Sequence, residues 1–290
     1  MEAVRILSLQ SSVAYGHVGN SAAVFPLQRL GHEVWPVHTV LFSNHTGYGA
    51  WRGPVVAASD VHEVVLGMED RGALAQVDLV LSGYQGSPEI AAVILDAVDR
   101  VKAANPAAAY ACDPVMGNAD SGCFVDPAIP VLIRDEVAPR ADVITPNQFE
   151  LGYLTGRLED QRRPPLDAVL EAADAARAMG PSTVLITSME HADQPEETLE
   201  MAVVTDDGAW SVRTPRLAMH ANGSGDVTAA LFSAHFFDTG DPAQALARTA
   251  SSVFDLLVNT LDAGSRELLL VESQATYAEP RMQFDVDKVR

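Results

Sequence analysis

Short apolar runs alternate along the chain with longer segments that have helical spacing. A short apolar run between polar turns is typical of a buried strand. The predicted strands are Arg5 to Gln10, Glu33 to Val40, Asp78 to Ser82, Ala109 to Asp113, Val143 to Thr145 and Thr183 to Ser188. The predicted helices between them are Ser21 to Leu30, Pro88 to Asn105, Gln148 to Thr155 and Leu166 to Met179. This alternation predicts an α/β fold with a mostly parallel central sheet flanked by helices on both faces.

The pattern changes near Glu200. Two apolar runs flank the turn-forming sequence Asp206-Asp207-Gly208 and predict a hairpin of Met201 to Thr205 with Trp210 to Arg213. The helices expected next are Asp226 to Asp238, Pro242 to Asp262 and Arg266 to Ala278, with Ser265 as N-cap of the last and an irregular tail after Pro280. Because no internal repeat or low-complexity linker occurs, residues 1–290 are expected to form a single domain.

The charge of the chain narrows the classes of partner. Of its 290 residues 48% are hydrophobic, and its formal net charge is −20. This charge argues against nucleic-acid binding, because phosphate contacts need surplus Lys and Arg. An anionic substrate would be held by local features such as a helix N-terminus or a metal ion. Two cysteines, no basic leader and no long apolar stretch predict a cytoplasmic protein without a membrane partner.

Polar and glycine residues collect directly after the predicted strands. They are Ser11 and Ser12, Ser43 to Gly49, Ser82 to Gly86, Asp113 to Gly122, Thr145 to Glu150 and Thr187-Ser188. Open parallel sheets bind ligands beyond the carboxyl ends of their strands. These segments are therefore predicted to form one ligand site at one edge of the sheet.

The sequence Gly223-Ser224-Gly225-Asp226 directly precedes a predicted helix and carries the clearest chemical signal. Glycines allow a sharp turn and close approach to a ligand, and backbone N–H groups at a helix N-terminus can bind an anion. A carboxylate among these donors is suited to accept a proton from an attacking hydroxyl while the amides neutralise a transferred phosphoryl group. The alternative is that Asp226 only caps the helix.

Two further carboxylates are candidate metal ligands. Glu150 lies one turn into the helix that Asn147 starts, and Asp113 ends an apolar strand. Both could bind Mg²⁺ through water, since Mg²⁺ keeps most of its hydration shell and takes one or two carboxylates. The alternatives are a capping box for Glu150 and a turn-forming role for Asp113. The chain lacks a Walker A ending and a Gly-x-Gly-x-x-Gly fingerprint after the first strand, which argues against a P-loop kinase and a dinucleotide enzyme.

Several motifs are informative in combination. They are Gln10-Ser11, Tyr15-Gly16-His17-Val18-Gly19-Asn20-Ser21-Ala22-Ala23, Ser43-Asn44-His45-Thr46-Gly47-Tyr48-Gly49, Leu81-Ser82-Gly83-Tyr84, Cys112-Asp113-Pro114-Val115-Met116-Gly117 and Gly223-Ser224-Gly225-Asp226. Together they resemble the bacterial pyridoxal kinases, in particular the second pyridoxal kinase type, of the ribokinase-like superfamily. The resemblance implies a ribokinase-like fold, a homodimer, and ATP- and Mg²⁺-dependent phosphorylation of the 5′-hydroxymethyl group of pyridoxal, and of pyridoxine or pyridoxamine, in vitamin B6 salvage.

The resemblance also implies residue roles. Asp226 would be the general base, with Gly223, Ser224 and Gly225 around the transferred group. The vitamin would contact Ser11, Thr46, Gly47, Tyr84 and Asp226. ATP would contact Asp113, Thr145, Glu150, Thr187, Ser188, Thr214, Pro215, Arg216 and Leu217, with Mg²⁺ at Asp113 and Glu150 through water. The chain departs from many relatives at Gly47, where a longer polar side chain is expected, and from some at Thr187, where they carry Lys.

Residues 118–126 are predicted to form a mobile flap that closes over the phosphates and excludes water. Cys123 in this segment is a candidate for reversible addition to the aldehyde of pyridoxal, and the alternative is an unreactive small residue. His17 and His45 are candidates for substrate contact. Two other functions stay open: a hydroxymethylpyrimidine kinase with the same fold, and a non-catalytic B6-binding protein.

Overall fold

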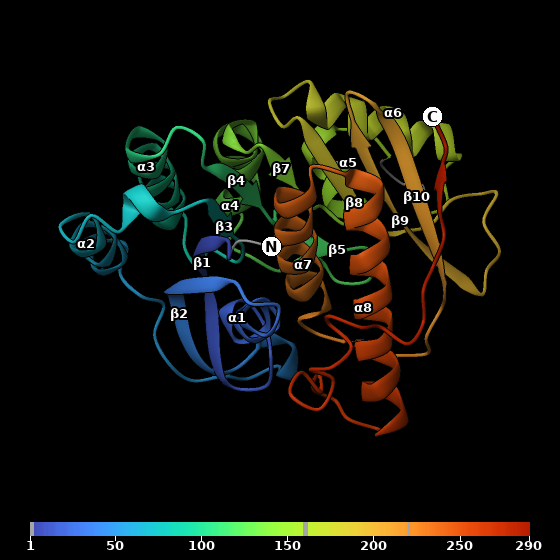
Figure 1. The fold of residues 1–290 in the computed structure, drawn as a ribbon, viewed down its shortest axis with the longest axis horizontal. Coiled ribbons are helices and arrows are strands. Elements are labelled where there is room, and N and C mark those ends of the chain that lie inside the picture. Colours follow the sequence, from blue (N-terminus) through green and yellow to red (C-terminus); the bar gives the residue numbers. More distant parts are fainter. Residues whose placement is uncertain (1–2, 159–161, 220) are drawn as a thin grey trace.

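The computed structural model describes residues 3–158, 162–219 and 221–290. Its centre is a nine-stranded sheet in the order β11-β10-β9-β8-β7-β4-β3-β1-β2, with helices on both faces (Figure 1). The strands are β1 (Arg5–Tyr15), β2 (Glu33–Asn44), β3 (Leu79–Ser82), β4 (Ala109–Cys112), β7 (Val143–Ile144), β8 (Thr183–Met189), β9 (Thr198–Thr205), β10 (Gly208–Pro215) and β11 (Val286–Lys288). From β8 to β2 all pairs are parallel, whereas β9, β10 and β11 are added as antiparallel strands. The predicted mostly parallel α/β fold is confirmed.

Two layers of helices cover this sheet. The α-helices of the described residues are α1 (Asn20–Arg29), α2 (Ala58–Glu69), α3 (Glu89–Ala104), α4 (Ala128–Leu132), α5 (Gln148–Thr155), α6 (Leu166–Arg177), α7 (Ser224–Thr239) and α8 (Pro242–Asp262). Side chains of α2, α3, α5 and α6 share one core cluster with Leu7 of β1, whereas those of α1, α7 and α8 share another with Ile6. Consecutive strand residues point to opposite faces, so the two layers lie on opposite sides of the sheet. None of the helices in the described ranges is both long and apolar enough to cross a membrane.

Strands β1 and β2 are longer than predicted. They continue past the rest of the sheet as a two-stranded ribbon, in which Ser12 pairs with Leu41 and Tyr15 with Asn44. The register shifts between Gln10 and Ser12, so a bulge marks the start of the ribbon. The prediction that β1 ends at Gln10 was wrong, because pairing with β2 satisfies the backbone of a polar stretch that has no strand-like pattern of its own.

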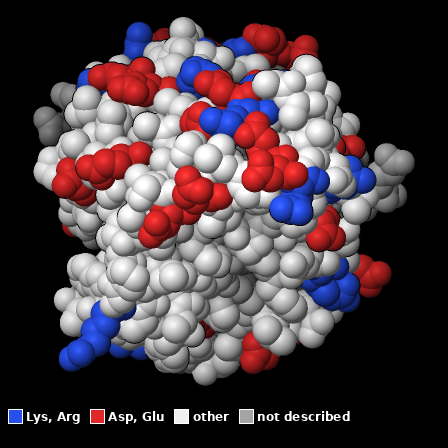
Figure 2. All heavy atoms as spheres, turned by 90° about the vertical axis from the view of Figure 1, so that its left-hand side faces the viewer, with Lys and Arg blue, Asp and Glu red and all other residues white. Residues whose placement is uncertain are grey.

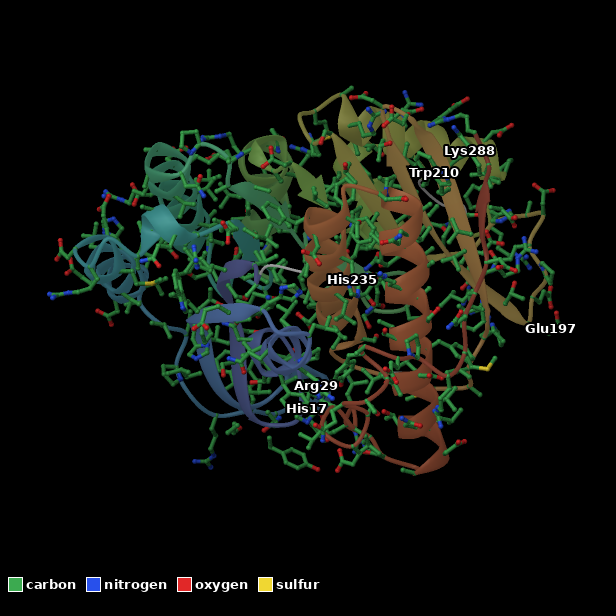
Figure 3. All side chains as sticks on the ribbon, viewed as in Figure 1. His17, Arg29, Glu197, Trp210, His235 and Lys288 are labelled. Atoms are coloured by element: carbon green, nitrogen blue, oxygen red, sulfur yellow. The ribbon has the colours of Figure 1, made fainter. Side chains whose placement is uncertain are left out.

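The C-terminal region differs from the prediction in two ways. Residues 266–278 form successive turns and not a helix; Ser265 Oγ accepts a hydrogen bond from the Glu267 N–H at 3.1 Å and donates to the carbonyl of the same residue. In the tail, where irregular structure was expected, β11 pairs with β10 and the Lys288 ammonium lies 5.2 Å from the ring centroid of Trp210 (Figure 3). The C-terminal strand is therefore fixed by a long-range pairing.

Helix α2 was not predicted. Its Val61 and Val65 are one turn apart and fully buried in the core cluster that they share with α3. Most other positions of the helix are exposed or half-buried, so its apolar stripe is narrow. The helix packs against α3 and covers the sheet next to β2 (Figure 1).

Candidate active site

Helix α7 begins at a glycine that no other residue can replace without movement of the chain. Gly223 is its N-cap, with a φ of 87°, and a Cβ atom there would lie 1.9 Å from the carbonyl oxygen of His17. An L-residue is strained at such a φ, and the distance excludes a side chain. The start of α7 therefore packs closely against the loop after β1. The N–H groups of a first helical turn have no partners within the helix, so they lie next to this loop.

Asp226 lies half-buried in the first turn of α7 and does not occupy the N-cap position. The backbone N–H of Gly19 lies near the Asp226 carboxylate and favours the ionised form. Gly19 in turn packs against Ser11, since a Cβ atom on Gly19 would lie 2.2 Å from the Ser11 Oγ. Burial raises the pKa of Asp226 to about 6, and the nearby N–H of Gly19 limits the rise. The structure thus brings Asp226 and Ser11 together through one glycine.

Asp113 and Glu150 are both buried at the ends of β4 and β7. The Thr145 hydroxyl donates to the Asp113 carboxylate at 3.1 Å. One carboxylate oxygen of Glu150 accepts from the N–H of Met116 at 3.0 Å, and the other from the N–H of Asn147 at 2.9 Å. The Asn147 side chain accepts from the Glu150 N–H at 3.0 Å, which completes a capping box. The structural alternative for Glu150 is confirmed, and it fixes the carboxylate beside Asp113.

The carboxylates of Asp113, Glu150 and Asp226 act on one another; we call them the acid cluster. Burial, together with the charges of Glu150 and Asp226, raises the pKa of Asp113 well above its usual range. Burial raises the pKa of Glu150 to about 7, against the effect of its backbone hydrogen bonds, and Asp226 adds to the rise. A divalent cation beside them would relieve this repulsion. In the described part of the chain no three acidic, His or Cys side chains could enclose a metal ion, so waters and phosphate oxygens would have to complete a Mg²⁺ coordination shell.

The predicted vitamin residues lie along the β1–β2 ribbon and the turn that follows it. Tyr84 is half-buried and packs against a small apolar cluster that consists of Val13, Val40 and Phe42 with Val18. Thr46 and Gly47 belong to a single 3₁₀ turn, Thr46–Tyr48, after β2. A Cβ atom on Gly47 would lie 3.0 Å from His45 Nδ1, so a longer side chain at this position would require the His45 ring to move. The ribbon and its turn therefore form one wall next to Ser11.

The first group of predicted nucleotide residues lies at the end of β8. The N–H of half-buried Thr187 donates to the carbonyl of Pro146 at 2.9 Å, which joins β8 to the loop that carries Glu150. Ser188 is exposed and has a φ of 51°, in the left-handed region that a residue with a Cβ atom seldom adopts. Such backbone strain concentrates at functional sites.

The second group is the segment Thr214, Pro215, Arg216 and Leu217 at the end of β10. The guanidinium of Arg216 pairs with Glu190 at 3.1 Å and donates to the carbonyl oxygens of Glu196 and Thr198 at 3.0 and 3.1 Å. The backbone N–H of Arg216 also donates to the Glu197 carbonyl at 2.7 Å. Arg216 therefore fixes the connection between β8 and β9 through both its guanidinium and its N–H.

The predicted flap contains a small hairpin. Strand β5 (Gly117–Asn118) pairs with β6 (Gly122–Cys123), and the Asn118 side chain accepts from the N–H groups of Asp120 and Ser121 at 3.0 and 2.8 Å. The Asn147 amide donates to the Gly117 carbonyl at 2.8 Å, so the base of the hairpin is fixed beside the acid cluster. Cys123 is exposed, and partial burial together with the charge of Glu150 raises its thiol pKa.

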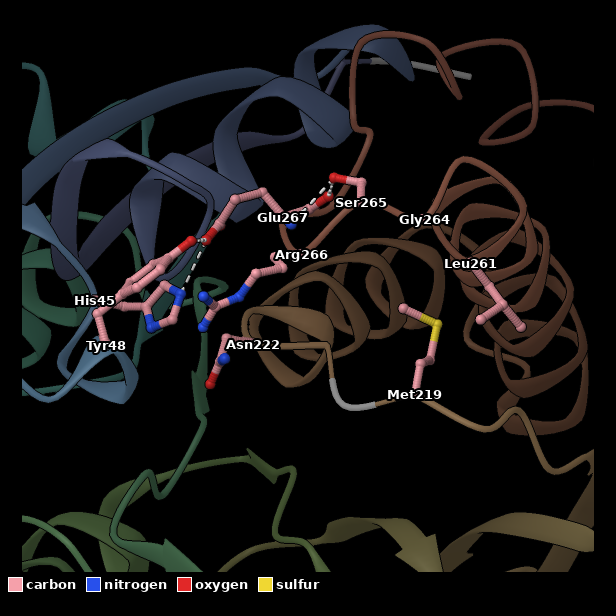
Figure 4. A pocket seen from close by; sticks show the side chains of 9 residues that line it. All are labelled: His45, Tyr48, Met219, Asn222, Leu261, Gly264, Ser265, Arg266 and Glu267. Atoms are coloured by element: carbon pink, nitrogen blue, oxygen red, sulfur yellow. Dashed lines mark hydrogen bonds and ion pairs between the residues drawn. The ribbon is translucent and has the colours of Figure 1, made fainter.

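One residue of the site was missed by sequence reasoning. Glu267 accepts a hydrogen bond from the Tyr48 hydroxyl at 2.6 Å and lies 3.1 Å from His45 Nε2 (Figure 4). A cavity of about 370 Å³ at this point is lined by His45, Tyr48, Met219, Asn222, Leu261, Gly264, Ser265, Arg266 and Glu267. No local signal marks Glu267, because the segment around it reads as a helix.

Comparisons with known proteins identify the family. A family model described as phosphomethylpyrimidine kinase matches residues 73–269. The pyridoxal kinase PdxY of Leifsonia xyli subsp. xyli is 66% identical over 99% of this chain and 100% of its own, and that of Corynebacterium diphtheriae is 60% identical with the same coverage. A solved pyridoxal kinase from Leishmania donovani, in complex with ADP and pyridoxamine, is 28% identical and matches over 99% of both chains with a TM-score of 0.91. The chain therefore belongs to the pyridoxal kinase family.

Proposed function

We propose that the chain transfers the γ-phosphoryl group of ATP to the 5′-hydroxymethyl group of pyridoxal, which gives pyridoxal 5′-phosphate for vitamin B6 salvage. Pyridoxine and pyridoxamine carry the same alcohol and are proposed as further substrates. The observation that carries this proposal is the position of Asp226 in the first turn of α7, next to the N–H of Gly19, which packs against Ser11. A carboxyl with a pKa of about 6 is largely ionised at neutral pH, as a general base must be.

The reaction would be a single displacement. The alcohol oxygen attacks the γ-phosphorus, the bond from this phosphorus to the bridging oxygen breaks, ADP leaves, and Asp226 takes the hydroxyl proton. The backbone amides of Gly223, Ser224 and Gly225 would face the transferred group, since N–H groups at a helix start stabilise developing negative charge.

Asp113 and Glu150 would hold Mg²⁺ through water, which neutralises charge on the phosphate oxygens when it is bound. The mutual repulsion within the acid cluster supports this role. The other proposed ATP contacts are Thr145, Thr187, Ser188, Thr214, Pro215, Arg216 and Leu217. The proposed vitamin contacts are Ser11, Thr46, Gly47 and Tyr84, with Asp226 at the alcohol.

The segment 118–126 would close over the phosphates as a flap, with the anchor at Gly117 as its hinge. Cys123 could add to the aldehyde of pyridoxal: a sulfur–carbon bond forms, the carbonyl oxygen takes a proton, and a hemithioacetal results. Its raised pKa leaves little of the reactive thiolate at neutral pH. If Cys123→Ser changes neither pyridoxal nor pyridoxine kinetics, the covalent contact is excluded.

A homodimer is proposed on the outer surface of the β1–β2 ribbon and the segment after it. Tyr15, Leu41, Trp51 and Val55 are large apolar side chains that are exposed there. In Figure 2, which faces this side of the molecule, charged side chains gather over the upper part and are sparse over the lower part. The same surface of a second copy would remove these side chains from water. Light scattering should give twice the chain mass for the wild type and half that value for Leu41→Asp.

The proposed location is the cytoplasm, where ATP is abundant and cysteines stay reduced. Cys112 and Cys123 are both free thiols in the structure, which fits a reducing compartment. Fractionation of cells that express the full chain would test the location.

The second candidate function, a hydroxymethylpyrimidine kinase, is favoured by the match to the phosphomethylpyrimidine kinase model. The deciding experiment is a panel of pyridoxal, pyridoxine, pyridoxamine and hydroxymethylpyrimidine with ATP and Mg²⁺, monitored for the phosphorylated product. The highest kcat/KM is expected for a B6 vitamer, with one ADP formed per phosphate ester. A higher value for the pyrimidine would favour the second function, and vitamin binding without product would indicate a non-catalytic B6 protein.

A further inference from the structure

One carboxylate from the C-terminal turns reaches two loops that are far from it in sequence, and Figure 4 shows its contacts with the loop of His45 and Tyr48. Glu267 Oε2 accepts a hydrogen bond from the backbone N–H of His17 at 3.1 Å. Its Oε1 accepts from the Tyr48 hydroxyl at 2.6 Å and lies 3.1 Å from His45 Nε2. The side chains of Glu267 and His45 are only 12% and 8% exposed, so water competes little for these contacts. Hydrogen bonds to an ionised acceptor in such surroundings are about twice as strong as neutral ones.

The surroundings of this carboxylate are shaped to accommodate it. Gly16 has a φ of 86°, and a Cβ atom there would lie 2.1 Å from Glu267 Oε2. Arg266 covers the outer side, with its guanidinium carbon 4.6 Å from the ring centroid of Tyr48. The Tyr48 ring in turn lies 4.6 Å from that of His45. The carboxylate is thus held between a glycine backbone on one side and two rings on the other.

A first chain of contacts leads from Glu267 to the proposed general base. Glu267 accepts a hydrogen bond from the N–H of His17, and two residues further on the N–H of Gly19 lies near the Asp226 carboxylate. The carbonyl of His17 is also the atom against which Gly223 packs at the start of α7. The loop between β1 and α1 therefore lies between Glu267 and the first turn of α7, which carries Asp226.

A second chain of contacts leads from Glu267 to the proposed vitamin site. Thr46 and Gly47 lie between His45 and Tyr48 after β2, and Glu267 contacts His45 and Tyr48, the two residues that flank this pair. A shift of this turn would displace Thr46 and leave the nucleotide residues of β8 and β10 in place. Glu267 thus connects the turn that carries Thr46 with the loop between β1 and α1 that carries Gly19.

We propose that Glu267 is a positioning residue for the phosphoryl acceptor: by fixing both loops it sets where the vitamin alcohol lies relative to Asp226. This role rests on the proposed function, which assigns the turn at Thr46 to the vitamin. Glu267 acts through the loops and does not touch the reacting atoms. Its loss should therefore affect the vitamin substrate and spare ATP.

The test compares Glu267→Ala and Glu267→Gln with Glu272→Gln in the full-length protein. Glu272 is an exposed glutamate in the same C-terminal segment and serves as the matched control. For Glu267→Ala we expect kcat/KM for pyridoxal to fall roughly 10- to 100-fold, since small misplacements carry costs of this size. The kcat/KM of Glu267→Gln should lie between those of the wild type and Glu267→Ala, because an amide keeps one acceptor oxygen but turns an NH₂ group toward the other donor. The control should match the wild type.

Three results would support positioning as distinct from a general loss of stability. The KM for ATP should change by less than about twofold, because its contacts are elsewhere. Pyridoxal, pyridoxine and pyridoxamine should lose kcat/KM by the same factor. The losses should persist well below the melting temperature of each variant. A loss confined to one vitamer, or an equal rise in the KM for ATP, would overturn the proposal.

A binding measurement keeps this proposal separable from the proposed function. The Kd for pyridoxal, measured by fluorescence titration in the presence of ADP, should rise in Glu267→Ala and stay unchanged in the control. A wild type that binds pyridoxal but makes no phosphate ester would contradict the kinase activity alone. An unchanged Kd and unchanged kcat/KM in Glu267→Ala would contradict the positioning role alone.

Discussion

Buried and half-buried carboxylates occur on two sides of the site, and their surroundings differ. In the acid cluster, Asp113, Glu150 and Asp226 act on one another as like charges, and the pKa of each is raised. Glu267, on the vitamin side, faces the His17 N–H, the Tyr48 hydroxyl and the His45 ring. The acid cluster therefore destabilises the folded protein when no ligand is bound. Glu267, in contrast, finds its hydrogen-bond donors within the fold.

This difference indicates two uses of burial. Carboxylates that repel one another at the end of a sheet can bind a cation or accept a proton. The free-energy cost of their repulsion is offset when Mg²⁺ and ATP bind. A carboxylate with its donors in place holds loops in position instead. Substitutions on the two sides should therefore have opposite effects on stability, although both lower activity.

Among the substitutions that compare the two regions, the largest effect is expected at their junction, where Gly223 packs against His17. Gly223→Ala forces a Cβ atom against the His17 carbonyl at a φ of 87°. We expect a loss of about 1–3 kcal/mol in the free energy of unfolding from backbone strain, and a fall in kcat/KM of roughly 10²-fold from displacement of Asp226. Thermal unfolding and steady-state kinetics measure both. Gly225→Ala is the stability control, because its Cβ atom would enter open space; a Gly223→Ala protein as stable as this control would contradict the packing argument.

The next prediction separates the acid cluster from Glu267 by the sign of the stability change. Asp113→Asn removes a carboxyl group whose pKa is raised by burial and by the charges of Glu150 and Asp226, so the Mg²⁺-free protein should become more stable by about 1 kcal/mol or more. Glu267→Gln should become less stable, because a donor then faces an NH₂ group. Denaturant titration without Mg²⁺ measures both changes. Asp113→Asn should also need roughly tenfold more Mg²⁺ for half-maximal activity, and a lower stability of this variant would contradict the account.

A third prediction uses pH. The folded-state pKa of Asp226 is about 6, above the usual 3.8, so between these values the folded protein binds more protons than the unfolded one. The contribution of Asp226 to stability is therefore lost as pH rises from about 4 to 6. Asp226→Asn should gain stability over the wild type across this window. Buried His235, whose pKa is lowered to about 4, acts with the opposite sign but cancels in the difference. A difference that stays constant with pH would contradict the raised pKa.

The smallest effect is expected from Tyr48→Phe. The variant loses a single hydrogen bond to Glu267, the same bond that is the main reason why the Tyr48 pKa rises to about 12. The KM for pyridoxal should rise roughly threefold, as expected for one modest hydrogen bond, with the KM for ATP unchanged. Tyr153→Phe on α5 is the matched control and should behave as the wild type. A loss as large as that of Glu267→Ala would indicate that Tyr48 carries the vitamin turn without Glu267.

The elements that could be predicted from the sequence are those whose signal is local. The helices α3, α6 and α8 carry their own apolar spacing, and Asn147 with Glu150 encodes the capping box that starts α5 within four residues. The glycine sequence before Asp226 likewise predicted the start of α7. These features were predicted because their stabilising contacts lie within one or two turns of chain.

The features that were missed depend on contacts between distant segments. Leu268 and Leu270 are two residues apart and both buried in one cluster with Val227 and Tyr277, a spacing that turns satisfy and a helix does not. Strand β11 exists only because β10 offers an edge, and the ends of β1 and β2 only because they pair with each other. Glu267 owes its place to loops about 220 and 250 residues away in sequence, so no window of the sequence could reveal it.

The central claim is that Asp226 accepts the proton of the vitamin alcohol, and single-turnover formation of pyridoxal 5′-phosphate tests it most directly. Wild type, Asp226→Asn and the control Asp238→Asn, at the other end of α7, would be mixed with ATP, Mg²⁺ and pyridoxal. The account predicts a rate roughly 10²- to 10⁴-fold lower for Asp226→Asn, with ATP and pyridoxal still bound, and an unchanged rate for the control. A rate for Asp226→Asn close to that of the wild type would contradict it.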